Sequence, residues 1–173
     1  MPDRNGKIFY TSITSLSHIS KCGELDFGIV EGDIHSEHLK KLPLGEDRLI
    51  AVCSPDYSAP SKISLGEAIR YPFLLRERGS ASRDLFEGVL AEKHFSASPF
   101  VESVSNEALI ALAAAGHGIA VLPEGIVGEA ISQGILKSLT IADASMTRTH
   151  YLLVHKNKRF NTLCQEAFDL LIQ

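Results

Sequence analysis

Hydroxyl groups gather at three points in the sequence where an apolar run of strand length is followed by a helical pattern. The amide groups at a helix start carry a partial positive charge, and serine or threonine hydroxyls beside them can donate further hydrogen bonds. Such an arrangement can hold a carboxylate or another small anion. The three segments are residues 10–14 (Tyr-Thr-Ser-Ile-Thr), 78–83 (Arg-Gly-Ser-Ala-Ser-Arg) and 103–106 (Ser-Val-Ser-Asn).

Each of these segments also has a simpler interpretation. Serine, threonine and asparagine are the usual caps of helices, so capping alone remains the alternative at every one of them. Three such segments in one chain nevertheless favour a shared anion-binding cleft, to which Arg76, Arg78 and Arg83 could add positive charge. The candidate ligand-binding residues are Ser12, Thr14, Arg76, Arg78, Ser80, Ser82, Ser103, Ser105 and Asn106.

Catalytic and metal-binding patterns are not found in the sequence. It contains no G-x-S-x-G, G-x-x-x-x-G-K-[ST] or H-E-x-x-H motif. Gly116-His117-Gly118 has a glycine pair without a third glycine, which predicts a helix stop and a tight turn rather than a nucleotide site. His117 has no spacing to Ser105 or Cys53 that supports a nucleophile and base pair. We therefore predict that the protein is not an enzyme and needs no cofactor.

The cysteines and the paired histidines have ordinary interpretations. Cys22, Cys53 and Cys164 are far apart, which predicts reduced, buried thiols. His35 and His38 lie three residues apart without a third ligand nearby, so we expect no metal site.

The elements that must position the candidate residues alternate between strand and helix. This alternation predicts an α/β fold with mostly parallel strands and helices on both faces of the sheet. Capping boxes are predicted at Ser64-x-x-Glu67 and Thr162-x-x-Gln165, and residues 31–45 are predicted to form a loop. Strands are predicted at 8–10, 25–30, 48–53, 72–75, 100–104, 119–122, 135–139 and 151–154, and helices at 13–22, 64–70, 83–93, 106–115, 124–132 and 162–171.

The composition is that of a globular protein, and the turn signals divide the chain. The 173 residues are 45% hydrophobic and 22% charged, with a net charge of −4, which argues against direct binding of a nucleic-acid backbone. No apolar run has the length of a membrane span, and no signal-peptide pattern follows the first residues. The turn cluster at 54–60 and the stretch 142–147 predict a first lobe of residues 1–54 and 148–173 and a second lobe of residues 55–147.

Several segments resemble a known family. Residues 23–29 (GELDFGI) are similar to the GELDLAI signature of LysR-type transcriptional regulators, and residues 47–52 with Ser54-Pro55 resemble their crossing strand. Residues 71–74, Gly79-Ser80 and Arg83 are similar to the entry of the second lobe. The strongest similarity is residues 105–123, which resemble the family's "eal..lvaaG.GialLP" stretch. The resemblance runs from about residue 7 to the end of the chain.

This resemblance implies an effector-binding domain with the two-lobed, type II periplasmic-binding-protein fold, in which each lobe is a mostly parallel sheet flanked by helices. Family ligand contacts correspond to Ser12 and Thr14, to residues 76–82 and to residues 103–106. The resemblance also implies a homodimer or higher homo-oligomer in the cytoplasm. It places DNA contact in an N-terminal winged helix-turn-helix that has no counterpart here, and the first strand and helix of lobe one also lack a counterpart.

Three functions are compatible with these features. The first is the effector-sensing domain of a bacterial LysR-type regulator, which binds a small anionic metabolite between its lobes to control transcription. The second is a solute-binding protein of the same fold that serves a transporter, against which the absent signal pattern argues. The third is an enzyme on this fold, which would need a catalytic pair that the sequence does not offer.

Overall fold

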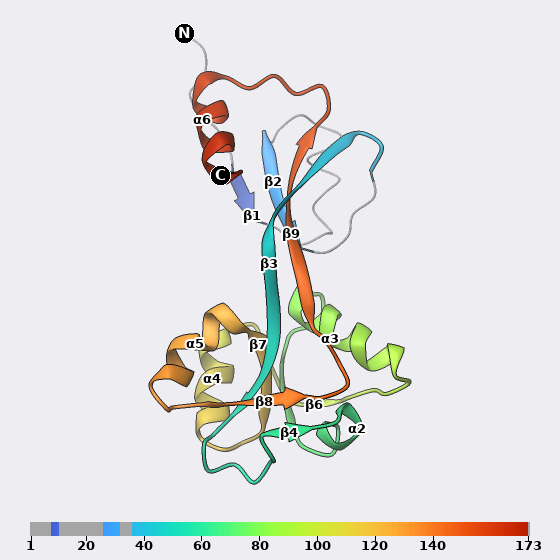
Figure 1. The fold of residues 1–173 in the computed structure, drawn as a ribbon, viewed down its shortest axis with the longest axis vertical. Helices are drawn as coiled ribbons and strands as arrows, with labels where there is room; N and C mark the ends of the chain where they lie inside the picture. Colours follow the sequence, from blue (N-terminus) through green and yellow to red (C-terminus); the bar gives the residue numbers. More distant parts are fainter. Residues whose placement is uncertain (1–7, 11–25, 32–35, 173) are drawn as a thin grey trace. The chain divides into compact units, whose positions relative to one another are not determined.

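A computed structural model of the chain describes residues 8–10, 26–31 and 36–172 (Figure 1). The chain divides into two compact units, one of residues 1–46 and 148–173 and one of residues 47–147. The lobes proposed from the sequence divide after residues 54 and 147. The end of the long strand β3 (Leu39–Cys53) belongs to the second unit, because it pairs there with strands β7 and β8.

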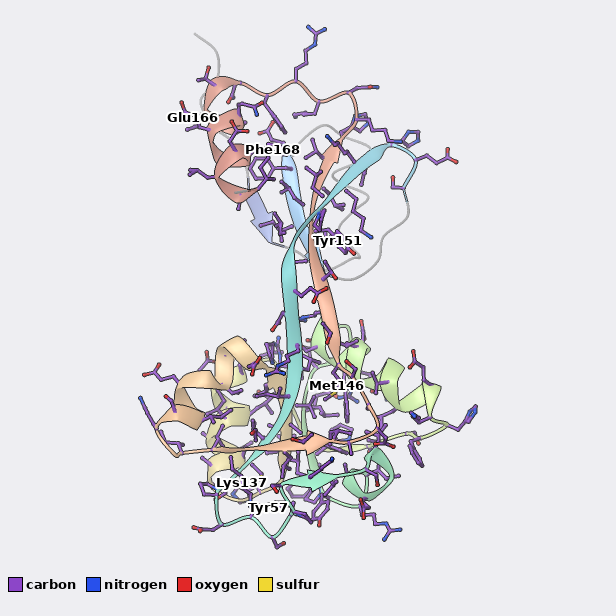
Figure 2. The ribbon with its side chains drawn as sticks, viewed as in Figure 1. Tyr57, Lys137, Met146, Tyr151, Glu166 and Phe168 are labelled. Carbon is purple, nitrogen blue, oxygen red and sulfur yellow. The ribbon has the colours of Figure 1, made fainter. Side chains whose placement is uncertain are left out.

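In the described residues, the first unit is a small sheet covered by helix α6. Strand β1 runs parallel to β2, and β2 runs antiparallel to β9. The buried side chains of Phe27, Leu152 and Val154 pack against the apolar side of the helix, including Phe168 (Figure 2). Its elements are β1 (Ile8–Tyr10), β2 (Phe27–Glu31), the first part of β3, most of β9 (Thr147–His155) and α6 (Thr162–Leu171).

The second unit is a larger mixed sheet with helices on both faces. Its strands follow the order β3-β7-β5-β6, with β5 parallel to both neighbours and β3 antiparallel to β7. Strand β8 pairs with β3 and with β4. The elements are β4 (Lys62–Ile63), α2 (Leu65–Ala68), β5 (Phe73–Arg76), α3 (Ala81–Glu92), β6 (Pro99–Ser103), α4 (Asn106–Ala114), β7 (Ile119–Pro123), α5 (Glu124–Ser132) and β8 (Lys137–Ile141).

Alternation along the central strands builds the core of this unit on both faces of the sheet. In β7 every residue is buried, with Ile119 and Val121 on one face and Ala120 and Leu122 on the other. Helix α3 covers the first face, and helices α4 and α5 cover the second, as Figure 1 shows on the two sides of the sheet. A strand buried on both faces is typical of a helix-covered sheet.

The first half of β3 corrects the loop predicted for residues 31–45. Residues 39–45 are strand, although Pro43 and Gly45 read as turn residues in the sequence. Leu39 is buried in the first unit, and Leu42 and Leu44 pack against its core. This half of the strand is held by packing in its own unit, which a local reading of the sequence does not detect.

Most predicted helix starts are confirmed, with one correction. Ser64 and Glu67 form the predicted capping box at α2. At α6 the cap is Asn161, whose side-chain oxygen accepts a hydrogen bond from the amide of Cys164 at 2.8 Å. The box predicted at Thr162 is therefore wrong, because the preceding asparagine already accepts from the first turn.

The Gly116-His117-Gly118 segment is a helix stop followed by a tight turn, as predicted. Gly116 ends α4 with φ +82°, a conformation that glycine adopts without strain. A Cβ at Gly118 would lie 2.3 Å from the carbonyl oxygen of Pro72. The segment therefore serves the approach of β7 to the start of β5.

Strand β6 is the last strand of the second unit's sheet. It begins at Pro99, and the side chains of Phe100 and Glu102 are exposed, Phe100 by 66%. None of the helices in the described ranges has the length and apolar content needed to span a membrane.

Candidate functional site

Four of the predicted ligand-binding residues come together where β5 and β6 end. Arg76 and Ser103 are register partners at the last positions of these two parallel strands. The Nη1 atom of Arg76 donates to Oδ1 of Asn106 at 2.9 Å, and Ser103 Oγ accepts from the amide of Ser105 at 3.1 Å. We call Arg76, Ser103, Ser105 and Asn106 the Arg76 cluster. It lies at the carboxyl edge of the parallel strands, where α/β sheets bind ligands.

The hydroxyl group of Ser105 is used by helix α4 itself. Its oxygen accepts from the amide of Ala108 at 3.1 Å and donates to the carboxylate of Glu107 at 2.7 Å. This bond is the largest cause that lowers the pKa of Glu107. Ser105 is thus a helix cap, which was the alternative interpretation of this segment.

The guanidinium group of Arg76 already holds a carboxylate. Its Nε and Nη2 atoms donate to the two carboxylate oxygens of Glu77 at 2.9 and 3.1 Å. This bidentate bond lowers the pKa of Glu77. The side chains are 20% and 33% exposed, so the pair lies at the surface of the cluster rather than inside the core.

Arg83 is a buried structural residue and not an added surface charge. Its side chain is 1% exposed and pairs with Glu87 at 2.5 Å and with Glu102 at 3.6 Å. Its Nη1 atom donates to the backbone carbonyl of Arg76 at 3.0 Å. The expectation that Arg83 adds positive charge for a ligand is therefore wrong, because its guanidinium group ties α3 to the ends of β5 and β6.

The three predicted residues near the start of α3 differ in their exposure and hydrogen bonding. Ser80 occupies the cap position of α3, but its hydroxyl makes no hydrogen bond to the amides of the first turn. Ser82 is buried in that turn, 6% exposed. Arg78 is exposed and forms no ion pair with any residue that the structure describes. Of these three residues, Ser80 offers a partly exposed hydroxyl beside a helix start.

Other sequence predictions fall outside the described ranges. Ser12, Thr14 and Cys22 belong to residues 11–25, and His35 belongs to residues 32–35, which the structure does not describe. His38 is described, and its ring stacks on that of His155 with centroids 6.5 Å apart.

A cavity of about 370 Å³ in the second unit was not predicted. Ser138 and Thr140 are among its lining residues, and the ion pair of Arg48 with Glu124 belongs to its wall. No sequence signal relates this arginine to a glutamate 76 positions away, because only the pairing of β3 with β7 brings them together. The remaining lining residues are Leu49, Ile50, Ala51, Ile131, Leu139, Ile141, Ala144, Ser145, Met146 and Thr147.

The thiols in the described residues are poorly suited to nucleophilic chemistry. Cys53 and Cys164 are buried and unpaired, as predicted. Burial is the largest cause that raises the pKa of both thiols, whereas a reactive cysteine needs a lowered pKa. Lys137 opposes this rise in the pKa of Cys53, and its ammonium group donates to the carbonyl oxygen of Tyr57 at 2.7 Å (Figure 2).

A comparison with known families decides the classification of the chain. The LysR substrate-binding domain matches residues 14–173. The chain belongs to this family. The predicted α/β, periplasmic-binding-protein-like fold is thereby confirmed.

Relatives of this LysR-family chain are transcription regulators. It is 25% identical over 146 residues to the HTH-type transcriptional regulator YeiE of Escherichia coli, covering 84% of this chain and 50% of that protein. It is 27% identical over 139 residues to the HTH-type transcriptional activator CmpR of Synechocystis, covering 80% and 45%. The chain thus spans about half the length of these relatives.

Solved structures share the LysR-family fold. The regulatory domain of CcmR from Synechocystis, in complex with 2-PG, aligns with a TM-score of 0.79 at 23% identity, covering 94% of this chain and 79% of that one. The effector-binding domain of QuiR, in complex with shikimate, aligns with a TM-score of 0.75 at 19% identity, covering 96% and 79%.

Proposed function

We propose that this chain is the effector-sensing part of a LysR-type transcription regulator and binds a small anionic metabolite. The single observation that carries this proposal is the Arg76 cluster, in which Arg76 Nη1 and Asn106 Oδ1 meet at 2.9 Å at the carboxyl edge of parallel strands. A guanidinium group beside a helix start is suited to a carboxylate. The names of the relatives favour a regulator over a transporter's solute-binding protein.

The proposed ligand class follows from the chemistry of the Arg76 cluster and of the start of α3. Ser80 offers a hydroxyl that is not used for capping, and Arg76 offers a guanidinium group. Shikimate, which the related QuiR domain holds, combines a carboxylate with hydroxyl groups. A hydroxylated carboxylic acid therefore fits the donors and acceptors available here. Ser12, Thr14, Arg78 and Ser82 complete the proposed binding set.

Regulation would follow from differential binding. The effector must bind one arrangement of the domain better than another, because equal affinity for both would shift nothing. Coupling free energies of this kind are typically about 1–3 kcal/mol. In the proposal the domain catalyses no reaction and acts as a cytoplasmic homodimer or higher homo-oligomer. DNA is bound by a separate helix-turn-helix of the whole regulator.

Calorimetric titration with a panel of hydroxylated and phosphorylated carboxylates, starting with shikimate, tests the proposal. We expect one or more of them to bind, and Arg76→Ala to weaken that binding by at least about tenfold through loss of a charge-assisted pair. Arg48→Ala is the matched control, since Arg48 holds Glu124 at the separate cavity. No heat across the panel, or binding lost in Arg48→Ala and kept in Arg76→Ala, would contradict it.

A further inference from the structure

The carboxylate of Glu77 is bound to the guanidinium group of Arg76, which the proposed function assigns to the ligand. Both of its carboxylate oxygens accept from Arg76, at 2.9 and 3.1 Å, in the geometry that an anionic ligand would take. The third contact of the guanidinium group, to Asn106, involves the Nη1 atom and leaves the bidentate face to Glu77. In the structure the anion-binding face of Arg76 is therefore filled by the neighbouring residue.

The surroundings of the pair show why Glu77 can be displaced. Glu77 directly follows Arg76, the last residue of β5, and lies two positions before Gly79, which has a φ of +86°. Its side chain is partly exposed, and among the described residues its carboxylate bonds to no residue other than Arg76 apart from its own backbone amide. The buried Arg83 differs, because the side chain that pairs with Glu87 also donates to the backbone carbonyl of Arg76. Glu77 can thus leave Arg76 without breaking the ties between β5 and α3.

We propose that Glu77 is a built-in competitor for the anionic group of the ligand and sets which anions the Arg76 cluster accepts. This inference rests on the proposed function. A tethered carboxylate competes at a high effective concentration, so only the fraction of molecules with an open Arg76 binds a ligand. A simple monocarboxylate offers Arg76 nothing that Glu77 does not already supply. An anion with further hydrogen-bonding groups adds contacts that Glu77 lacks, and it displaces the side chain.

Acetate is the probe for this competition, because it carries a carboxylate and nothing else that bonds to the cluster. Titration at pH 7 is followed through the backbone amide NMR signals of Asn106 and Glu107. We expect Glu77→Gln to bind acetate about tenfold more tightly than the unmodified chain. Glu129→Gln is the matched control, since it removes the same charge from α5, where Glu129 accepts from Gln133.

A double variant, Glu77→Gln with Arg76→Ala, locates the effect. We expect the double variant to lose the tighter acetate binding of Glu77→Gln, because the acetate then has no guanidinium group to bind. Equal acetate affinities for the unmodified chain and Glu77→Gln, including no binding by either, would overturn the inference. So would a gain that also appears in Glu129→Gln or survives in the double variant. The calorimetric panel judges the proposed function separately, since Arg76→Ala can abolish binding there whatever acetate does.

Discussion

Helices α3 and α4 begin in the same way and use their first serine differently. Each follows a strand of the parallel pair β5 and β6, and each has a serine in extended conformation at its cap, Ser80 and Ser105. Ser105 accepts from the amide of Ala108, whereas Ser80 bonds to no amide of its first turn. A hydroxyl that caps a helix is committed to the fold, and one that does not remains available for a ligand.

The charges at the two starts differ as well. Helix α3 carries the buried Arg83 in its first turn, where it holds the carbonyl of Arg76. Helix α4 carries Glu107, which is exposed and accepts from Ser105. The start of α3 is thus held by a buried arginine, and the start of α4 is held by the side-chain cap of Ser105. The following predictions test this contrast, beginning with the largest effect.

Replacing the buried cation should have the largest effect on folding. We expect Arg83→Met to lower the free energy of unfolding by about 2 kcal/mol, because the Arg76 carbonyl loses its donor and two carboxylates lose their partner. Urea unfolding measures this. The control is Arg78→Met, at an exposed arginine five positions earlier, which should change stability by less than about 0.5 kcal/mol. Similar losses for both variants would contradict a structural role for Arg83.

Removing the two cap serines should separate the helix starts. Ser105→Ala should destabilise the protein by about 1 kcal/mol, which is the usual contribution of a side-chain cap. Ser80→Ala should cost only a few tenths of that, about 0.3 kcal/mol, because Ser80 makes no cap bond. Thermal and urea unfolding of the two variants measure the difference. A larger loss for Ser80→Ala would reverse the assignment of the two hydroxyls.

The same two variants should differ in the opposite sense in ligand binding. Ser80→Ala should weaken binding of a carboxylate that the calorimetric panel identifies as a ligand. We expect a loss of about threefold, because one neutral hydrogen bond is removed. Ser105→Ala should weaken the affinity of the folded protein less, because the hydroxyl of Ser105 is already used within α4. Calorimetry at a temperature where both variants are folded gives the comparison. Equal weakening would show that both hydroxyls reach the ligand.

The smallest effect should appear in the titration of Glu107. Its pKa lies below the ordinary value of 4.5, mainly because of the Ser105 hydroxyl, and should rise toward that value in Ser105→Ala. A lowered pKa stabilises the folded state above the ordinary pKa, and this stabilisation is lost as the pH falls through the folded value. Ser105→Ala should therefore respond less to acid below pH 4.5. NMR titration checks this, with Glu77 as the internal reference held low by Arg76.

Local signals allowed most of the second unit, and helix α6 of the first unit, to be predicted. The bounds of α5 and α6, the caps Ser64 and Ser105, and the helix stop at Gly116 depend on residues close in sequence. The meeting of Arg76 with Ser103 also followed from a general rule, since parallel strands end at one edge. These features are fixed by short-range hydrogen bonding and topology.

The remaining features depend on tertiary partners. The first half of β3 contains Pro43 and Gly45 and is held by packing of its leucines. Arg83 reads like its neighbours Arg76 and Arg78, and only the fold buries it. The pairing of Arg76 with Glu77 depends on the rotamers of adjacent residues. Spacing alone could not separate a binding arginine from a structural one.

The exposed strand β6 has a consequence for the solubility of the chain. A strand at the end of a sheet can recruit a strand from another molecule and begin aggregation, particularly when it carries an exposed aromatic ring such as Phe100. Pro99 at its start has no amide hydrogen to donate, and Glu102 places a negative charge on the same exposed side. These two residues act as gatekeepers of the edge, so the same carboxylate that pairs with Arg83 also keeps neighbouring molecules apart.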